Sequence, residues 1–435
     1  MLDLLRDRTY RHLFAAQVTA LLGTGFLTIA LGLLAYDLAE VGAGTVLGTI
    51  FTLKMVIYVT LAPVAGAFAD RLPRRALLVG LDLVRASTAL ALPFVTETWQ
   101  VYALVAVLFA ASAAFTPAYQ ATLPDILPEE ARYTRALSLS RLAYDLENIL
   151  SPALAGLVLL AFAYDALFFG TLAGFTASAA LILTVTLPRV DPAPARGIWD
   201  RTTRGIRIYL ATPRLRGLLA LNLAAAAGGA MVIVNTYVLV LSHLGLGENA
   251  VALALGAFGA GSMASALILP RLLDRTGDRP VMLAGAVVLC AALAGLAAVG
   301  LSWPGVLIAW LIAGLGYSAV LTPSGRLIRR SAQPADRPAV FAAQFALSHA
   351  CWLIAYPTAG FVMTRAGPTA ALTALAGLAL AGILFATRLW PRDDPRIVPH
   401  EHPDLPPDHP HLAGHGPHAH EIRFDALHHE WPRQG

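Results

Sequence analysis

The chain is a series of apolar stretches, each about 20 residues long, separated by short segments that collect its charges and prolines. An α-helix needs about 20 apolar residues to cross the hydrocarbon core of a bilayer. Backbone polar groups inside lipid must be paired within the chain, so uninterrupted stretches of this length fold as helices there. The sequence therefore predicts an all-α integral membrane protein.

Twelve such stretches can be delimited, and the solvent around most of the chain is predicted to be lipid. Apolar residues make up 57% of the sequence and charged residues only 13%, whereas soluble proteins carry roughly a quarter charged residues. The predicted membrane spans lie near 11–36, 45–69, 76–95, 99–121, 137–162, 166–187, 215–241, 249–271, 280–300, 304–325, 338–363 and 368–388.

Arginine gathers in alternate loops, which predicts the orientation in the membrane. Loops after even-numbered spans carry groups such as Arg132 with Arg135 and Arg329 with Arg330, whereas the other loops carry acids such as Glu97 and Glu248. By the positive-inside rule, the arginine-rich loops and both termini are cytoplasmic. The predicted location is a bacterial-type cytoplasmic (inner) membrane.

An internal repeat divides the spans into six and six. Asp70-Arg71 returns as Asp274-Arg275 after 204 residues, and Gln17 returns as Asn222 after 205. A parallel repeat of this kind is typical of transporters whose halves rock about a central site. The predicted domains are 1–187 for the first half, 188–214 for a cytoplasmic linker, 215–390 for the second half and 391–435 for a disordered tail.

The repeated charged loop predicts a gate. A carboxylate beside arginines at a helix end can form an ion-pair latch that breaks and reforms as the halves move. The alternative is that the arginines only fix topology, although the positive-inside rule requires no carboxylate. The candidate gating residues are Gly66, Asp70, Arg71, Arg74, Arg75, Asp274, Arg275, Gly277 and Arg279.

The run from Gly66 to Arg75 resembles the signature loop of the major facilitator superfamily. Two more segments, Tyr10 to Gln17 and Phe115 to Ala121, resemble its branch of macrolide, siderophore and nickel exporters. The resemblance implies a pseudo-symmetric twelve-helix fold and alternating access, with no enzymatic activity. Ser151 to Gly156 resembles a proton-antiporter motif, which implies export against proton entry.

Charges inside the spans are the next signal, because each costs roughly 2.5–3.5 kcal/mol at a helix centre on insertion scales. Lys54, the only lysine, lies in the second span. Asp82 and Arg85 are three residues apart and are predicted to neutralise each other. Arg141 can pair with Asp145 four residues on, which leaves Glu147 the less compensated acid of the fifth span.

The repeat relates these fifth-span residues to the eleventh span, because an offset of 205 places Tyr144 opposite His349 and Glu147 opposite Trp352. Protonation of Glu147 in a shared cavity would couple proton entry to substrate release. The alternative is that such residues only form interhelical hydrogen bonds. The candidate cavity residues are Lys54, Arg141, Tyr144, Asp145, Glu147, His349 and Trp352.

The tail after Trp390 holds most of the histidines among Pro, Asp and Gly. Imidazoles with nearby carboxylates suit nickel, cobalt, zinc or copper. The alternative is a solvated segment that is merely rich in histidine. The candidate metal ligands are His400, His402, His409, His411, His415, His418, His420, His428 and His429.

Together these features predict a monomeric, proton-coupled efflux permease whose leading substrate is a divalent transition metal ion. An exporter of a small organic compound is the first alternative, and a non-transporting membrane metal sensor is an alternative of another class. The expected partners are the lipid bilayer, protons and the solute, without nucleic acid. No cofactor is required, although a transition metal could bind as substrate or in the tail.

Overall fold

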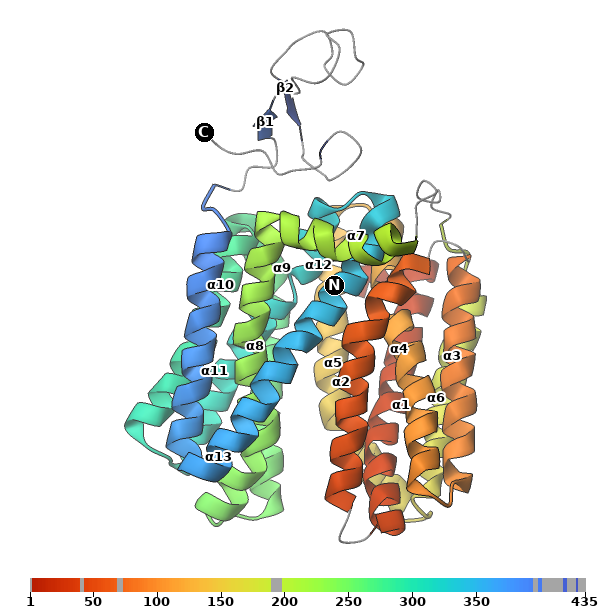
Figure 1. Cartoon of the computed structure of the whole chain (residues 1–435), viewed down its shortest axis with the longest axis vertical. Helices are drawn as coiled ribbons and strands as arrows, with labels where there is room; N and C mark the ends of the chain where they lie inside the picture. Colours follow the sequence, from red (N-terminus) through yellow and green to blue (C-terminus); the bar gives the residue numbers. More distant parts are fainter. Residues whose placement is uncertain are drawn as a thin grey trace.

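The computed structural model describes residues 2–39, 43–68, 73–188, 198–393, 398–400, 418–420 and 428. Long helices make up most of it (Figure 1). They are α1 (Arg8–Ala39), α2 (Ala43–Phe68), α3 (Arg74–Ala91), α4 (Thr98–Ile126), α5 (Glu130–Leu159), α6 (Asp165–Leu183), α7 (Ile198–Ala211), α8 (Pro213–Tyr237), α9 (Glu248–Thr276), α10 (Asp278–Val299), α11 (Trp303–Leu321), α12 (Ser324–Ser331) and α13 (Arg337–Leu389).

The predicted all-α membrane fold is confirmed. Among the described residues, nine helices are long and apolar enough to cross a membrane. The other spans are α2, whose apolar part is Thr49–Ala65, the second segment of α13, and α5.

Helix α13 consists of two spans that meet at Gly367. This residue has φ +81° and ψ −179°, which interrupts the helix. Glycine adopts a positive φ without steric penalty, and Pro368 then suits the first turn of the next helix. The chain therefore reverses direction here, as the predicted boundary between the last two spans requires.

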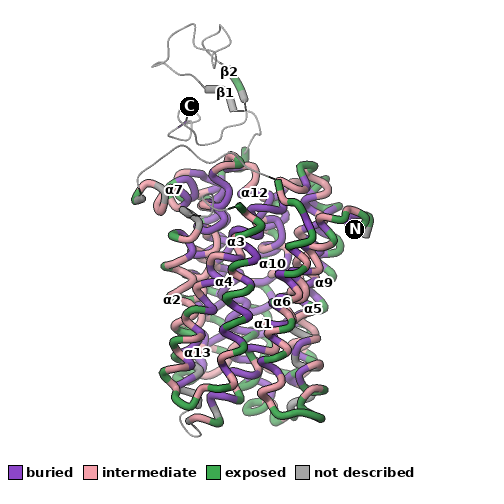
Figure 2. The backbone as a smooth tube through the Cα atoms, turned by 90° about the vertical axis from the view of Figure 1, so that its right-hand side faces the viewer, coloured by how far each residue is buried: buried purple, intermediate pink, exposed green. Residues whose placement is uncertain are grey.

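The helices form two groups that lie side by side, α1–α6 and α8–α13 (Figure 1). Each group has its own apolar cores. Between the groups, α2 packs against α13 and α5 packs against α9. Buried residues run through the interior of the bundle over its whole length, and exposed residues lie on its outside (Figure 2). The exact residue boundaries of the two halves stay predictions.

One end of the bundle, here called the arginine-rich end, carries the loops that follow α2, α4, α6, α9 and α11. Helix α7 lies across this end (Figure 1). Arg204 forms an ion pair of 2.6 Å with Asp336, just before α13. A Cβ on Gly205 would lie 2.0 Å from the Ala339 carbonyl oxygen, so only glycine permits this approach. The sequence analysis predicted a linker here but not its helix.

The tail contains one element in its described residues. Strand β1 (Val398–His400) pairs antiparallel with β2 (His418–His420), and the register places His400 opposite His418. The candidate ligands His402, His409, His411, His415 and His429 lie outside the described residues. The disordered tail predicted from composition therefore includes a short hairpin.

Candidate binding cavity

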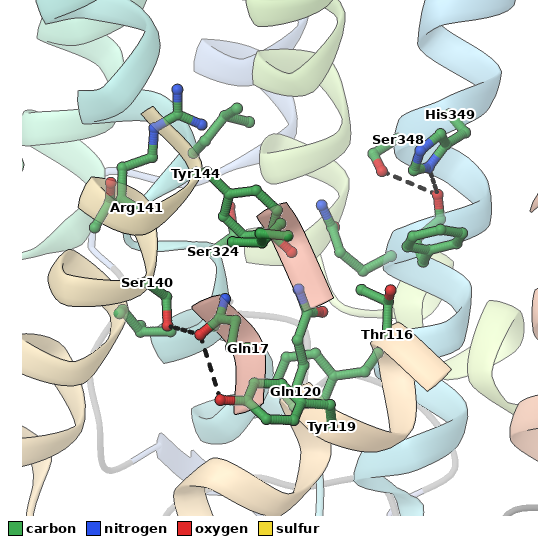
Figure 3. Close-up of a pocket in the computed structure, with 18 of the residues that line it drawn as sticks. Gln17, Thr116, Tyr119, Gln120, Ser140, Arg141, Tyr144, Ser324, Ser348 and His349 are labelled. Atoms are coloured by element: carbon green, nitrogen blue, oxygen red, sulfur yellow. Dashed lines mark hydrogen bonds between the residues drawn. The ribbon is translucent and has the colours of Figure 1, made fainter. Parts of the chain in front are cut away.

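A cavity of about 480 Å³ lies between the two groups of helices (Figure 3). Helices α1, α2, α3, α4 and α5 line it from the first group, and α8, α11, α12 and α13 line it from the second. The predicted residues Lys54, Arg141, Tyr144, Glu147, His349 and Trp352 are all among its lining residues. Tyr144 and Glu147 thus line the same cavity as His349 and Trp352, the residues that the repeat offset of 205 relates to them.

Asp145 is the predicted member that does not line the cavity. It is 3% exposed and forms the predicted ion pair with Arg141, at 2.5 Å. Arg141 Nε also donates to Ser262 Oγ at 3.0 Å, and Ser262 belongs to α9 in the second group. The Arg141 guanidinium is therefore neutralised and held in place across the two groups.

Lys54 has an aromatic environment. Its Nζ lies 5.6 Å from the centre of the Tyr58 ring and 5.7 Å from that of Phe109. Glu147 is the carboxylate that acts on it electrostatically, yet no ion pair within 4.0 Å joins them in the described part of the chain. Both groups thus keep an open side toward the cavity.

Glu147 is held against the backbone of α1. A Cβ on Gly25 would lie 2.8 Å from Glu147 Oε1 and 2.2 Å from Ser151 Oγ. Only a glycine at position 25 lets α1 and α5 approach this closely. Any change in the position of Glu147 is therefore coupled to the packing of these two helices.

His349 is orientated by its neighbours. Its Nδ1 lies 2.7 Å from the Phe345 carbonyl oxygen, and because a carbonyl only accepts, Nδ1 donates and Nε2 is left as an acceptor. The ring packs edge-on against Tyr58, with centroids 4.9 Å apart. Among the described residues, no group of three or more His, Cys, Asp or Glu side chains could hold a metal ion.

The sequence analysis did not identify Arg85, Gln17 and Asn222 as cavity residues, although all three line it. Arg85 forms the predicted ion pair with Asp82, which also accepts from Ser178 at 2.7 Å. The guanidinium lies 4.0 Å from the centre of the Phe115 ring. For Gln17 and Asn222 the signal was available, since they are matching residues of the repeat.

The predicted gating residues lie at the arginine-rich end. Asp70 and Arg71 are outside the described residues, Gly66 lies in α2, and Gly277 separates α9 from α10 with φ +81°. In the described part of the chain, the other gating residues make contacts only within their own helix group. In the first group, Arg74 pairs with Asp125 and Arg75 donates to the Val185 carbonyl. In the second group, Asp274 lies 3.8 Å from Arg326 and Arg279 donates to the Trp390 carbonyl. Arg275 lies in the last turn of α9.

Different charges join the two groups at this end. Arg337 of α13 forms an ion pair of 2.6 Å with Asp125 of α4. Arg326 of α12 forms one of 2.7 Å with Glu130 of α5 and donates to Thr134 at 2.6 Å. These contacts join the two helix groups at the arginine-rich end. The sequence analysis used the arginines between α11 and α13 only to predict the orientation in the membrane, because nothing in the sequence pattern paired them with particular acids.

Comparison with known sequences identifies a family. A family model described as Major Facilitator Superfamily matches residues 13–241 and 218–412. The chain is 32% identical over 139 residues to the uncharacterized MFS-type transporter YfiS of Bacillus subtilis (strain 168), which is 32% of each chain. It is 25% identical over 183 residues to macrolide efflux protein A of Streptococcus pyogenes, 41% of this chain and 44% of that protein. The matched segments thus span less than half of either relative.

Solved structures share the fold over nearly the whole bundle. The human organic anion transporter MFSD10 (TETRAN) has a TM-score of 0.75 at 15% identity, covering 87% of this chain and 99% of its own. A bacterial homologue of the iron transporter ferroportin in its outward-facing state has a TM-score of 0.72 at 16% identity, covering 88% and 98%. At these identities the likeness shows the fold alone.

Proposed function

The chain belongs to the major facilitator superfamily, and from this membership we propose that it exports a small organic compound by alternating access in exchange for protons. The cavity between the two helix groups is the observation that carries the proposal. At about 480 Å³ it falls in the range of roughly 300–1,000 Å³ that is usual for sites of drug-sized ligands.

The lining of the cavity suits an organic compound. Aromatic rings of Tyr58, Phe115, Tyr119, Phe345 and Trp352 alternate there with amides and hydroxyls. Aromatic side chains supply apolar contact area, and a few polar groups fix the orientation of a ligand. The efflux activity in the name of the Streptococcus pyogenes relative supports the direction of transport.

The charges that face the cavity give less support to the metal ion that the sequence analysis ranked first. Divalent transition metals take carboxylate, imidazole or thiolate ligands, and among the lining residues only Glu147 and His349 offer such ligands. Lys54, Arg85 and Arg141, which also line the cavity, are cationic. One observation keeps the metal as a second candidate. Nine of the chain's twelve histidines lie in the tail after Trp390, and imidazoles of this number would allow the tail to collect an ion.

The ion pairs at the arginine-rich end are proposed to be the gate. The positive-inside rule makes this the cytoplasmic end, so closure by Asp125–Arg337 and Glu130–Arg326 describes a state that cannot take up substrate from the cytoplasm. Rocking of the two groups would break these pairs and open the cavity inward.

Glu147 is proposed to carry the proton. Its carboxylate lies in the cavity, is in contact with the α1 backbone region at Gly25, and is compensated only at a distance by Lys54. Protonation removes its charge, which changes both its interaction with Lys54 and its ability to accept hydrogen bonds from a substrate. Substrate and proton would then bind alternately.

Uptake into inverted membrane vesicles with an acidic lumen tests the proposal. Erythromycin and ethidium are compared with nickel, zinc and cobalt, for the full chain and for a chain truncated after Pro391. We expect uptake of an organic compound that a protonophore abolishes and that the truncation leaves unchanged. Uptake of metal alone, lost on truncation, would instead support the metal exporter, and no uptake of any probe would support the sensor.

A further inference from the structure

Gln17 and Asn222 hold matching positions in the repeat, one on α1 and one on α8, and both line the cavity. Both are buried, Gln17 at 8% exposed and Asn222 at 2%. Buried amides in proteins are nearly always hydrogen-bonded, because an unpaired polar group loses its contacts with water without replacement. The two amides can therefore be compared by their partners.

Gln17 is satisfied by its own helix group. Its Oε1 accepts a hydrogen bond from Ser140 Oγ at 2.9 Å and another from the Tyr119 hydroxyl at 3.3 Å (Figure 3). These hydroxyls come from α5 and α4. The amide oxygen of Gln17 is thus hydrogen-bonded entirely within the first helix group.

Asn222 has no such network. Within the described part of the chain, neither its Oδ1 nor its Nδ2 has a hydrogen-bond partner. The repeat explains why. Thr116-Pro117 matches Thr322-Pro323, so Tyr119 corresponds to Gly325, and the offset of 205 matches Ser140 to Phe345. Both hydroxyls that hold Gln17 are replaced by side chains that cannot form hydrogen bonds.

Two further unpartnered hydroxyls line the same cavity. Neither Tyr133 Oη nor Ser324 Oγ has a hydrogen-bond partner in the described residues. They come from opposite helix groups, α5 and α12. A Cβ on Gly325, next to Ser324, would lie 2.5 Å from Tyr133 Oη, so the two groups meet there. Besides the charged residues Lys54 and Glu147, the cavity therefore contains a set of uncharged donors and acceptors without a partner among the described residues, on Asn222, Tyr133 and Ser324.

We propose that Asn222 binds substrate through its carboxamide and that the substrate carries a hydroxyl or amide group, an inference that rests on the proposed function. A carboxamide offers one acceptor and a donor pair, and a hydroxyl or secondary amide can donate and accept in return. Tyr133 and Ser324 add hydrogen bonds from the two groups. The substrate part held here is uncharged and rich in hydrogen-bonding groups.

Chloramphenicol is a suitable probe, because it is neutral and has two hydroxyls and a secondary amide. Its 1,3-di-O-acetyl derivative lacks both hydroxyl donors, and ethidium is a permanent cation without hydroxyls. Affinities for all three are measured by titration calorimetry on the purified full chain. The Asn222→Leu variant should weaken chloramphenicol binding by about tenfold, as expected for a lost hydrogen-bonding partner, and leave ethidium binding unchanged. The diacetyl derivative should bind the native chain more weakly than chloramphenicol.

Thermal unfolding separates binding from structure. Replacing an unpaired buried amide by a side chain of the same shape is neutral or stabilising, so Asn222→Leu should melt no lower than the native chain. Asn235→Leu is the matched control on the same helix. Asn235 does not line the cavity and donates to the Ala359 carbonyl at 3.2 Å, so this variant should melt lower but bind chloramphenicol normally. Asn222→Ala replaces the leucine variant if the latter fails to fold.

The inference is overturned if Asn222→Leu weakens ethidium as much as chloramphenicol, or if it melts lower and binds chloramphenicol like the native chain. Binding of ethidium but not of chloramphenicol by the native chain also overturns it and leaves the proposed function intact. If no organic probe binds or is transported, the proposed function fails as well.

Discussion

Asp125 of α4 and Arg337 of α13 form an ion pair of 2.6 Å across the boundary between the two helix groups, with each side chain 9% exposed. The same carboxylate also pairs with Arg74 of its own group. Next to Arg337, Asp336 holds Arg204 of α7 at 2.6 Å. The contact between the two groups at the arginine-rich end is therefore linked both to the first residue of α3 and to α7.

Asp125→Asn is expected to open the arginine-rich end. Removal of one partner from a buried ion pair costs about 3–5 kcal/mol, because the other charge is left uncompensated. Here that cost falls on the closed state. A cysteine introduced as Ser324→Cys, in a chain with Cys290 and Cys351 replaced by alanine, should react more than tenfold faster with an impermeant maleimide added from the arginine-rich side.

The control for this experiment is Asp7→Asn. Asp7 lies 3.8 Å from Arg132, both side chains are about one-third exposed, and the pair lies within the first group. Exposed pairs contribute about 0–1 kcal/mol, so labelling should not change. Equal labelling in both variants would exclude Asp125 from the gate.

Glu147→Gln is expected to uncouple transport from the proton gradient. Glutamine keeps the size of the side chain and its hydrogen-bonding capacity but carries no titratable proton. Gradient-driven uptake into inverted vesicles should fall to its level without a gradient, while exchange of substrate across the membrane continues. The control is Glu129→Gln, an exposed acid whose side chain does not cap α5. Unchanged gradient-driven uptake in Glu147→Gln would remove this residue from coupling.

Asp145→Asn is expected to destabilise the protein rather than to change its substrate. Asp145 is buried and neutralises Arg141, so its removal should cost about 3–5 kcal/mol. The double variant Arg141→Gln with Asp145→Asn removes both charges and should recover much of this loss. Urea unfolding in detergent measures the coupling energy as a double-mutant cycle. A double variant that is no more stable than Asp145→Asn would show that the pair does not act as a unit.

The fold was predictable because lipid leaves few alternatives for apolar stretches of this length. The repeat carried the prediction further. An offset read from surface loops placed Glu147 and His349 in one space, and both line the observed cavity. Arg85 was missed because its ion pair with Asp82 seemed to account for it, whereas a paired guanidinium can still face a cavity.

The inter-group ion pairs were beyond sequence reasoning for a physical reason. Arg337 and Asp125 are 212 residues apart, and they meet only through the packing of the two helix groups against each other. A pattern along the chain specifies spans and repeats, but it does not specify which conformational state brings two distant loops together. Helix α7 left a clearer signal, since Ile198, Gly205 and Tyr209 recur at helical spacing, but the sequence analysis assigned the segment 188–214 only as a linker between the halves.

Gly25→Ala is expected to impair transport by moving Glu147. The added methyl group would lie 2.2 Å from Ser151 Oγ and 2.8 Å from Glu147 Oε1, distances that require α1 and α5 to separate. Gly32→Ala is the matched control on the same helix, because a Cβ there meets nothing within 4 Å. It should transport normally and gain up to about 1 kcal/mol from the higher helix propensity of alanine. Cross-linking between cysteines in α1 and α5 would report the separation directly. Normal transport and cross-linking in Gly25→Ala would show that the close approach of α1 to Glu147 is not needed for coupling.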